Sequence, residues 1–487
     1  MGTGNDLHPT PAATSAHRRR SEFLATVAAL VVVLMIGDAY GATAGRAVAF
    51  AMPPNPGTQQ VPAKLGTVTA IAAGDAHSIA LLSNGTVVTW GENFFGQLGD
   101  GTNARRTTAV RVCAVGQSAP CSRFLTGVIA IAANRNDNLA LLRDHTVVAW
   151  GYNSFGQLGD GTWTNRTTPV RVCAVGQVAP CGRFLSGVRS IVAGWTHTLA
   201  AMENGSAVAW GWNGQGQLGD GTTATRLTPV KVCAVGQVAP CGKFLSGVRS
   251  VAAGWGHSLA VVGNALAVAW GRNYEGQLGD GTTVGRTTPV RVCAVGQVAP
   301  CDQFLYAVNA IAGGEFHSMS LRGDGGPVGW GANYVGELGD GTVVNRAIPV
   351  RVCAVGEIAP CHRFLYGIRH IAVGASHSMA QLSSGGVLGW GFNGYGQLGN
   401  GTWDTRLQVT QVCAVGEAAP CDRSLSGVRS IAAGTAHSLA LQPDYTVAAW
   451  GYNAQRQLGD GTTTWRPTPV QVLAPPNLVP HQGMFAS

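Results

Sequence analysis

A 60-residue unit repeats along this chain and constrains its fold more than any other feature. From residue 61 onward, seven copies follow one another without an insertion. Each copy carries a Trp-Gly pair and then a segment close to Gly-Gln-Leu-Gly-Asp-Gly-Thr, first at residues 96–102. Such a period is typical of solenoids, propellers and other arrays, whose units bury a core only against their neighbours. The repeated tryptophans are Trp90, Trp150, Trp210, Trp270, Trp330, Trp390 and Trp450.

Each copy contains four short segments with β-strand composition. In the first copy these are residues 68–73, 77–82, 86–90 and 107–112. Asn-Gly and Asp-Gly turns between such segments indicate antiparallel hairpins, and no segment has a helical period of useful length. We therefore predict an all-β, seven-bladed β-propeller of four-stranded antiparallel blades. An open β-solenoid is the alternative, although its repeats are usually shorter.

The repeat resembles that of the regulator of chromosome condensation family. The resemblance covers about residues 61–473 and lies in Gly-x-x-His-Ser-x-Ala-Leu, Gly-Thr-Val-x-x-Trp-Gly and Asn-x-x-Gly-Gln-Leu-Gly-Asp-Gly. It implies a seven-bladed propeller. Members of the family include a nuclear exchange factor for a small GTPase, a plant ultraviolet-B photoreceptor and a secreted bacterial β-lactamase inhibitor. The property they share is protein binding, and one fold can serve many functions.

The N-terminal segment, residues 1–44, has the features of an export signal. Arg18–Arg20 precede an apolar stretch over residues 23–36, which has the length of a signal-peptide core, and Ala42–Ala44 offers a cleavage site. An uncleaved membrane anchor is the alternative. Both place the rest of the chain outside the cytoplasm, since an arginine cluster stays inside. We therefore expect an extracellular or cell-surface protein with a linker over 45–60, a propeller over 61–473 and a C-terminal tail over 474–487.

All 12 cysteines fall in six copies of Cys-Ala-Val-Gly-x-x-Ala-Pro-Cys, while the seventh copy has Leu473 at the first position. Even pairing behind an export signal predicts local disulfides formed in an oxidising compartment, as in a secreted, disulfide-containing bacterial-type member of the family. Zinc is the competing interpretation, but the spacing does not match a zinc knuckle. The predicted pairs are Cys113–Cys121, Cys173–Cys181, Cys233–Cys241, Cys293–Cys301, Cys353–Cys361 and Cys413–Cys421.

Two polar residues also recur with the period. A histidine stands at position 77 and its equivalents, with Asp137 in the second copy. We predict half-buried histidines bonded to backbone groups rather than a metal site, because equivalent positions on neighbouring blades are too far apart to share one ion. An arginine, first Arg106, follows an aspartate, first Asp100, by six residues. This spacing predicts a repeated ion pair that braces the Gly-rich turn.

Composition and motifs disfavour several classes of function. Charged residues make up only 11% of the chain, and the net charge of +8 is spread over the copies rather than gathered into the basic stripe of a nucleic-acid-binding protein. The chain has no Gly-x-Ser-x-Gly, no His-Glu-x-x-His and no P-loop. We therefore expect a monomeric protein without catalytic residues, cofactor or metal. Its partner would be an unidentified extracellular or envelope protein, and it would meet a membrane only through a retained N-terminal segment.

Blade topology separates two faces of the predicted ring. Loops after the first and third strands share one face, here called the loop face, whereas the turn after the second strand and the Cys-bridged loop share the other, the Cys face. The Cys face is nearly the same in every copy, and the loop face holds the variation. All six tryptophans outside the repeated pairs fall in loops of the loop face: Trp163, Trp195, Trp212, Trp255, Trp403 and Trp465.

An aromatic-rich loop face on a rigid scaffold is typical of a protein-binding surface. The alternative is that each ring folds back over its own blade and covers the Gly-rich turns. A second function, an exchange factor for a small GTPase, is implied by the resemblance to the founding family member. We predict partner contacts at Phe94, Phe95, Tyr152, Trp163, Trp195, Trp212, Trp255, Tyr274, Phe316, Tyr334, Phe392, Tyr395 and Trp403, with Trp195, Trp212, Trp255 and Phe316 in one cluster.

Overall fold

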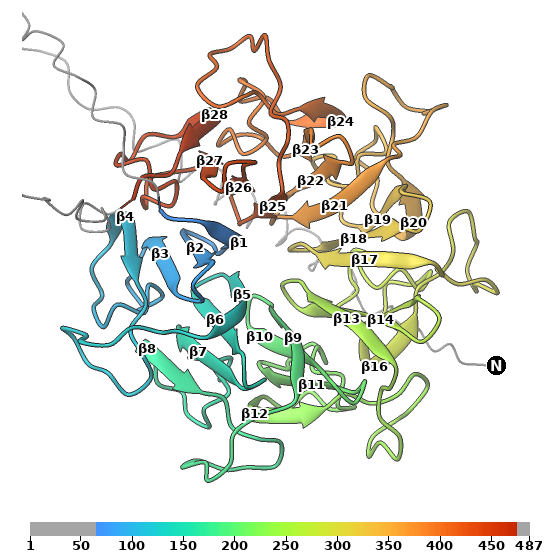
Figure 1. Cartoon of the computed structure of the whole chain (residues 1–487). Coiled ribbons are helices and arrows are strands. Elements are labelled where there is room, and N and C mark those ends of the chain that lie inside the picture. The colour runs from blue at the N-terminus through green and yellow to red at the C-terminus, as the bar shows by residue number, and fades with distance from the viewer. Residues whose placement is uncertain (1–64, 475–487) are drawn as a thin grey trace, which may run out of the picture. The chain divides into compact units, whose positions relative to one another are not determined.

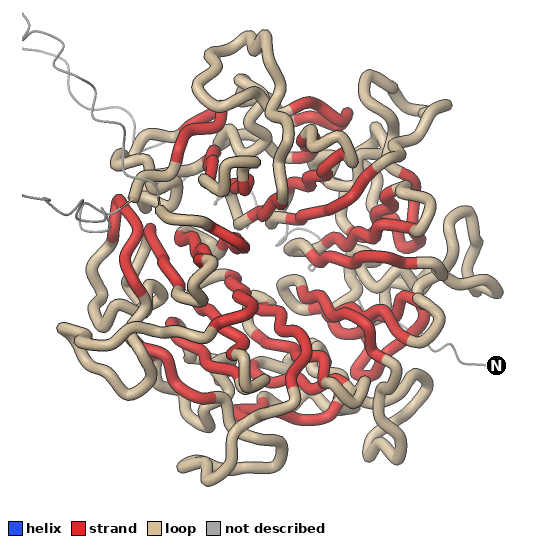
Figure 2. The backbone as a smooth tube through the Cα atoms, in the orientation of Figure 1, coloured by secondary structure: helices blue, strands red, loops and turns tan. Residues whose placement is uncertain are grey.

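The computed structural model describes residues 65–474, so the predicted signal, linker and nearly all of the predicted tail lie outside the described residues. Seven antiparallel four-stranded sheets stand in a ring (Figure 1). Figure 2 shows that the described residues form only strands and loops. The predicted seven-bladed all-β propeller is confirmed. Within residues 65–474, no helix is long and apolar enough to cross a membrane.

Each blade is built from one copy of the repeat. The first blade contains β1 (Val68–Ala73), β2 (His77–Leu82), β3 (Val87–Gly91) and β4 (Arg106–Arg111), which pair in that order from the axis to the rim. The second to fourth blades contain β5 (Val128–Asn134), β6 (Asp137–Leu142), β7 (Val147–Gly151), β8 (Arg166–Arg171), β9 (Val188–Ala193), β10 (His197–Met202), β11 (Ala207–Gly211), β12 (Arg226–Lys231), β13 (Val248–Ala253), β14 (His257–Val262), β15 (Leu266–Gly271) and β16 (Arg286–Arg291).

The last three blades repeat this order. They contain β17 (Val308–Gly313), β18 (His317–Arg322), β19 (Pro327–Gly331), β20 (Arg346–Arg351), β21 (Ile368–Val373), β22 (His377–Leu382), β23 (Val387–Gly391), β24 (Arg406–Gln411), β25 (Ser430–Ala433), β26 (His437–Leu441), β27 (Val447–Gly451) and β28 (Arg466–Gln471). No sheet mixes strands from the two ends of the chain, so the ring closes through contacts between the seventh and first blades rather than within one sheet.

The repeated tryptophan joins each blade to the one before it. All seven rings are completely buried. The indole N–H of Trp210, for example, donates a hydrogen bond of 2.8 Å to the carbonyl oxygen of Gln157 in the preceding blade. Gly159 must be a glycine because its φ is +68° and a Cβ would lie 2.7 Å from the Trp210 ring nitrogen. The tryptophan and the Gly-rich loop are therefore one interlocking unit of the core.

The repeated histidines form a second link between blades, and the prediction of half-buried histidines bonded to backbone is wrong. His197 is completely buried, and its Nε2 lies 2.8 Å from Ser258 Oγ in the next blade. The series closes the ring, since His437 Nε2 of the last blade lies 3.0 Å from Ser78 Oγ of the first. The second strands of neighbouring blades lie so that a serine hydroxyl of one blade reaches the histidine of the other. The sequence of a single copy cannot show this contact. Burial lowers the pKa of His197 to about 3, so the ring is neutral.

The Cys-bridged loops and the Arg–Asp pairs match their predictions. All six predicted disulfides are present, and none of the described cysteines is free. Arg106 and Asp100 form an ion pair of 2.6 Å, and the pair recurs in every copy except the sixth. There Asn400 replaces the aspartate, and Arg406 lies 3.8 Å from Asp404 instead. Both features hold the Gly-rich turn and the segment after the last strand of each blade.

Candidate partner-binding face

The two loop types expected on the loop face meet in one groove. The groove, of about 510 Å³, is lined by Asp75, Asn136 and Thr435 from loops after first strands. Loops after third strands supply further lining residues, Glu92 and Arg105 among them. Loops after first strands and loops after third strands therefore lie on the same face here, as the sequence predicts. Its other lining residues are Ala76, Phe94, Phe95, Tyr395, Ala436, Tyr452 and Gln455.

A continuous run of aromatic rings crosses the loop face from the first blade to the fifth. Neighbouring ring centres lie 4.7–6.2 Å apart, within the range in which edge-to-face and tilted ring pairs attract. The rings come from blades that neighbour one another, so each loop supports the next. The run consists of Phe94, Phe95, Tyr152, Phe155, Trp212, Trp255 and Phe316.

A second aromatic run covers the sixth and seventh blades. Its ring centres lie 5.2–5.7 Å apart. The groove joins the two runs, because Phe94 and Phe95 of the first run line it together with Tyr395 and Tyr452 of the second. The two runs together are called the aromatic belt below. The second run consists of Phe392, Tyr395, Tyr452 and Trp465.

Most rings of the belt are half-buried, since each leans on its neighbours. Phe94 is the most exposed, at 68%. Trp163, Tyr334 and Trp403 are also exposed, but within residues 65–474 they make no contact with another ring. Each half-buried ring is therefore partly covered by its neighbours and partly exposed to solvent.

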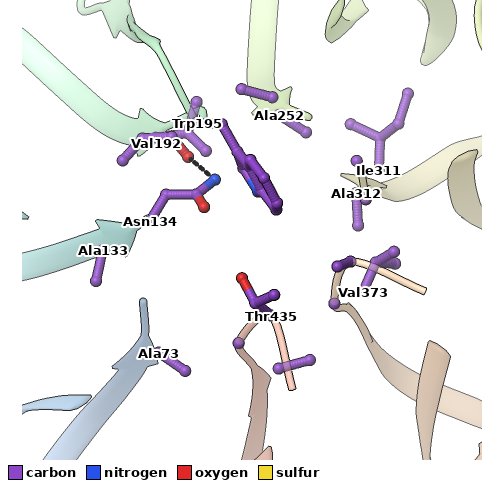
Figure 3. Close-up of a pocket in the computed structure, with 18 of the residues that line it drawn as sticks. Ala73, Ala133, Asn134, Val192, Trp195, Ala252, Ile311, Ala312, Val373 and Thr435 are labelled. Atoms are coloured by element: carbon purple, nitrogen blue, oxygen red, sulfur yellow. Dashed lines mark hydrogen bonds between the residues drawn. The ribbon is translucent and has the colours of Figure 1, made fainter. Parts of the chain in front are cut away.

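Trp195 departs from the predicted cluster. Trp212 and Trp255 are in contact, as are Trp255 and Phe316. Trp195, however, lines a cavity of about 220 Å³ on the propeller axis (Figure 3). The guanidinium of Arg135 lies 6.0 Å from its ring centre. Trp195 and Trp255 are equivalent positions one period apart, yet Trp195 lines the axial cavity and Trp255 joins the aromatic belt.

The axial cavity is formed by the ends of all seven innermost strands. Its wall is made mostly of alanine and glycine, because only small side chains fit where seven strands converge. Asn134 crosses between blades and donates its amide N–H to the Ala193 carbonyl oxygen at 2.9 Å (Figure 3). Thr435 supplies a hydroxyl from the seventh blade (Figure 3). Trp195 is thus the one large aromatic side chain among the lining residues.

Charges on the loop face are paired within the face. Arg272 lies over the rings of Trp255, Tyr274 and Phe316, with its guanidinium carbon 5.3, 5.0 and 4.1 Å from their centres. It also forms an ion pair of 2.7 Å with Glu275. Such stacking holds the rings in place and stabilises the cation. Arg272 therefore fixes the central part of the aromatic belt.

The groove between the two aromatic runs also contains an ion pair. Glu92 and Arg105 form an ion pair of 2.8 Å. Burial raises the pKa of Asp75, although a hydrogen bond to Thr435 and the charge of Arg135 act against that shift. Burial likewise raises the pKa of Glu315, against the charge of Arg272. The groove therefore combines two carboxylates, one arginine and several aromatic rings.

Sequence reasoning missed Glu92 and Arg272 because it searched the loop face only for aromatic residues. A signal for both was present. The residue after each Trp-Gly pair varies from copy to copy, as Glu92, Tyr152, Trp212, Arg272, Ala332, Phe392 and Tyr452. Six of these seven are large or charged, and the structure assembles them into the belt and its braces.

Metal-ligating and acidic side chains are dispersed over the described residues. Between residues 65 and 474, no group of three or more His, Cys, Asp or Glu side chains is placed to hold a metal ion. Asp137, the exception in the histidine series, is completely buried, and its carboxyl oxygens have no hydrogen-bond partner of normal geometry. Burial raises its pKa well above the usual value. It lies in the blade interior, away from the groove lining.

Known proteins resemble this chain over most of its length. A model of the RCC1-like domain matches residues 21–307, and models of the regulator of chromosome condensation (RCC1) repeat match residues 328–381, 384–441 and 368–397. Ultraviolet-B receptor UVR8 of Arabidopsis thaliana is 30% identical over 353 residues, which cover 72% of this chain and 70% of that protein. Secretion-regulating guanine nucleotide exchange factor of Mus musculus is 30% identical over 399 residues, 79% and 78% of the two chains.

Solved structures share the fold. Yeast RCC1 (Prp20), determined with Kap60 bound to it, superposes with a TM-score of 0.60 at 20% identity, over 87% of this chain and 91% of that one. At that identity the similarity shows the fold alone. The domain model, in contrast, spans more than half of the chain, and the two relatives named above match it along most of their own length. With seven blades of the same repeat, this chain belongs to the regulator of chromosome condensation (RCC1) repeat family.

Proposed function

We propose that this propeller is a secreted or surface-tethered binding protein that holds a protein partner on its loop face. The aromatic belt is the observation that carries the proposal. Its rings are fixed by one another and by Arg272, so little side-chain entropy is lost when a partner covers them. Rigid aromatic side chains with open edges are the residues that most often dominate protein–protein affinity. The aromatic belt meets both conditions, since its side chains are held in place and remain partly exposed on a rigid propeller.

The groove suggests the chemistry of the partner. Among the residues that line the groove, Asp75 and Glu92 supply two carboxylates and Arg105 supplies one positive charge, while the charge of Arg135 also acts on Asp75. Phe95, Tyr395 and other rings surround them. A basic side chain would gain both an ion pair with Asp75 and a cation–π contact, whereas an acidic one would be repelled. We therefore propose a partner segment that carries a lysine or arginine flanked by apolar residues.

Location outside the cytoplasm is part of the proposal. The six disulfides support it, since such bonds persist in oxidising compartments and are rare in the cytosol. The Arg18–Arg20 cluster and the apolar residues after it support an export signal or a retained anchor. The partner in that compartment is an extracellular or envelope protein. The propeller acts on it by binding and not as an enzyme.

A second function is favoured by one relative. Secretion-regulating guanine nucleotide exchange factor resembles most of this chain. An exchange factor of that kind would bind a small GTPase in the cytoplasm and speed nucleotide release. The two proposals are distinguished by location and by the partner recovered, since a cytosolic chain would keep its thiols reduced.

The test begins with the mature, oxidised propeller as bait for extracellular and envelope proteins. We expect Trp212→Ala and Trp255→Ala to weaken binding of the recovered partner by roughly 30-fold, because loss of a central aromatic anchor typically costs about 2 kcal/mol. Melting temperatures of both variants should change little, since the rings are half-buried on loops. Affinity is measured by calorimetry on purified partner.

Gln177→Ala on the Cys face is the matched control and should leave affinity unchanged. Trp195→Ala separates two docking modes. It should have little effect if the partner stays on the belt, and a large effect if the partner reaches into the axial cavity. Affinity that responds only to changes on the Cys face would overturn the proposal. Recovery of a small GTPase whose nucleotide release the propeller accelerates would favour the exchange-factor function instead.

A further inference from the structure

At six of the seven blade junctions, a glycine of one blade lies against the outermost strand of the next. A Cβ on Gly216 would lie 2.8 Å from Thr287 Cα, and one on Gly396 would lie 2.7 Å from Pro467 Cα. Nearby, the amide N–H of Gly401 donates to the Pro467 carbonyl oxygen at 2.9 Å. A larger residue does not fit this contact, because its Cβ would meet the backbone of the outer strand and because φ is positive at both glycines, +78° and +77°. The rim of the propeller is therefore closed at these junctions.

The Cys-bridged loop covers the same outer strand from the side. Thr228 of β12 donates its hydroxyl to the Gln177 carbonyl oxygen in the preceding Cys loop, at 3.0 Å. Thr288 of β16 does the same to Gln237, at 2.9 Å. Each of these Cys loops thus completes the packing of the next blade as well as its own. Removal of such a loop would leave an outer strand uncovered.

The junction between the seventh blade and the first differs at the rim. Arg456, with a φ of +72°, stands where the other six copies have the close-packed glycine. Among residues 65–474, no hydrogen bond joins the Gly461 amide to β4, although its equivalents at five other junctions make one. Closer to the axis this junction is like the others, since the indole N–H of Trp90 donates to the Gln457 carbonyl oxygen at 2.9 Å. The ring is therefore closed inside and open outside at this one place, which we call the seam.

An open groove of about 780 Å³ lies on β4 at the seam. Ala109, Val110 and Phe124 give it an apolar lining, and Pro120 of the first Cys loop forms a side. Ala109 stands where five of the six other blades, each with a preceding Cys loop, have proline, which leaves more room. Ala474, the last described residue, belongs to the same buried apolar cluster as Ala109. The last described residue therefore shares a core cluster with a residue of the groove lining.

The next residues of the chain resemble a Cys loop without its cysteines. Residues 474–481 read Ala-Pro-Pro-Asn-Leu-Val-Pro-His, in register with Ala-Val-Gly-Gln-Val-Ala-Pro-Cys of residues 174–181. Ala474 and Pro480 match, and Asn477 replaces a glutamine in most copies. Leu473 and His481 stand where the two cysteines would be. The segment keeps the length and apolar character of the loop that covers an outer strand at the other junctions.

We propose that residues 475–481 dock in the groove on β4 and act as a seventh, disulfide-free Cys loop that closes the rim at the seam. The segment is anchored at Ala474, so its effective concentration at the groove is high. Leu478 and Val479 make this segment apolar, and the groove has the same character. The two ends of the propeller are then held together at the rim by a contact that no covalent bond secures.

The test is a cross-link between the tail and β4. Thr108 and Asn477 correspond by period to Thr228 and Gln177, which are in contact. We expect the double variant Thr108→Cys with Asn477→Cys, made in the full chain, to form an intramolecular disulfide in most molecules under mild oxidation. Peptide mapping under non-reducing conditions identifies the bond. The matched control pairs Asn477→Cys with Thr288→Cys, whose strand is already covered by its own Cys loop.

A bond between positions 108 and 477 in the monomer, absent from the control pair, supports the proposal. A bond found only in dimers would overturn it and indicate that a second copy occupies the groove. Equal bonding in both pairs would also overturn it. As an independent readout, Val479→Asp should lower the melting temperature by several degrees, whereas Gln482→Asp, just beyond the segment, should not. Equal melting temperatures for these two variants would contradict docking.

Discussion

Tryptophan has two roles in this protein, and its position in the repeat decides which. The seven repeated tryptophans are completely buried and join neighbouring blades. The variable ones stand in loops, where their exposure ranges from half-buried to the 53% of Trp163. An identical residue in every copy indicates a structural role, because every copy has the same blade fold but different loops.

We expect Trp210→Ala to lower the free energy of unfolding by about 3–5 kcal/mol, the usual range for removal of a large buried ring. The Gln157 carbonyl oxygen would also lose its donor. Trp163→Ala, on an exposed loop, is the matched control and should change stability by less than about 0.5 kcal/mol. Urea denaturation of both variants measures the difference. Near-wild-type stability of Trp210→Ala would show that this junction is not part of the core.

Strands and loops show how far a single copy predicts its own structure. The segments expected over 86–90 and 107–112 are β3 (Val87–Gly91) and β4 (Arg106–Arg111), each displaced by one residue. The displacement follows from pairing of Gly91 with Arg106 after a register shift at Thr89. Ladder register depends on both strands at once, so one strand's composition could not define it.

We expect thiol titration of the denatured mature protein to find no free cysteine. All six bonds close short loops beside the outer strands, and each would contribute roughly 2–3 kcal/mol on a chain-entropy model. The double change Cys233→Ser with Cys241→Ser should therefore lower stability by about that amount, while Ser122→Ala in another Cys loop should not. Twelve reactive thiols in native protein would contradict both the disulfides and the proposed compartment.

At the scale of the whole molecule, buried histidines link six of the seven junctions in one layer. His197 and His257 of neighbouring blades each have a pKa lowered to about 3, mainly by burial. Asp137 interrupts the layer in the second blade, and its pKa is shifted upward by burial. The histidines of the layer are therefore uncharged at neutral pH, and in the folded protein they resist protonation.

This layer predicts acid sensitivity. An unfolded histidine takes up a proton below its ordinary pKa of 6.5, whereas His257 in the folded chain does so only near 3. The free energy of unfolding should therefore fall as the pH drops from 6.5 toward 4, by about 1.4 kcal/mol per pH unit for each such histidine. Asp137 acts in the opposite direction, because its raised pKa favours the folded form at low pH.

The measurement is urea denaturation between pH 7 and pH 4.5. His257→Asn should reduce the number of protons taken up on unfolding at pH 5 by about one. Stability that does not depend on pH over this range would show that the buried histidines titrate in the folded state.

The sequence by itself determined the number of blades, the strands of each blade, the disulfides and the Arg–Asp pairs, because all of these are local to one copy and are repeated seven times. Only the tertiary structure decided which side chains meet between copies. Trp195 turned to the axis while the equivalent Trp255 joined the belt, the histidines found partners in the next blade, and the seam appeared where the seventh copy lacks both a glycine and a Cys loop. Those contacts form between side chains that differ from copy to copy. A repeat pattern shows only what the copies have in common, so it cannot predict them.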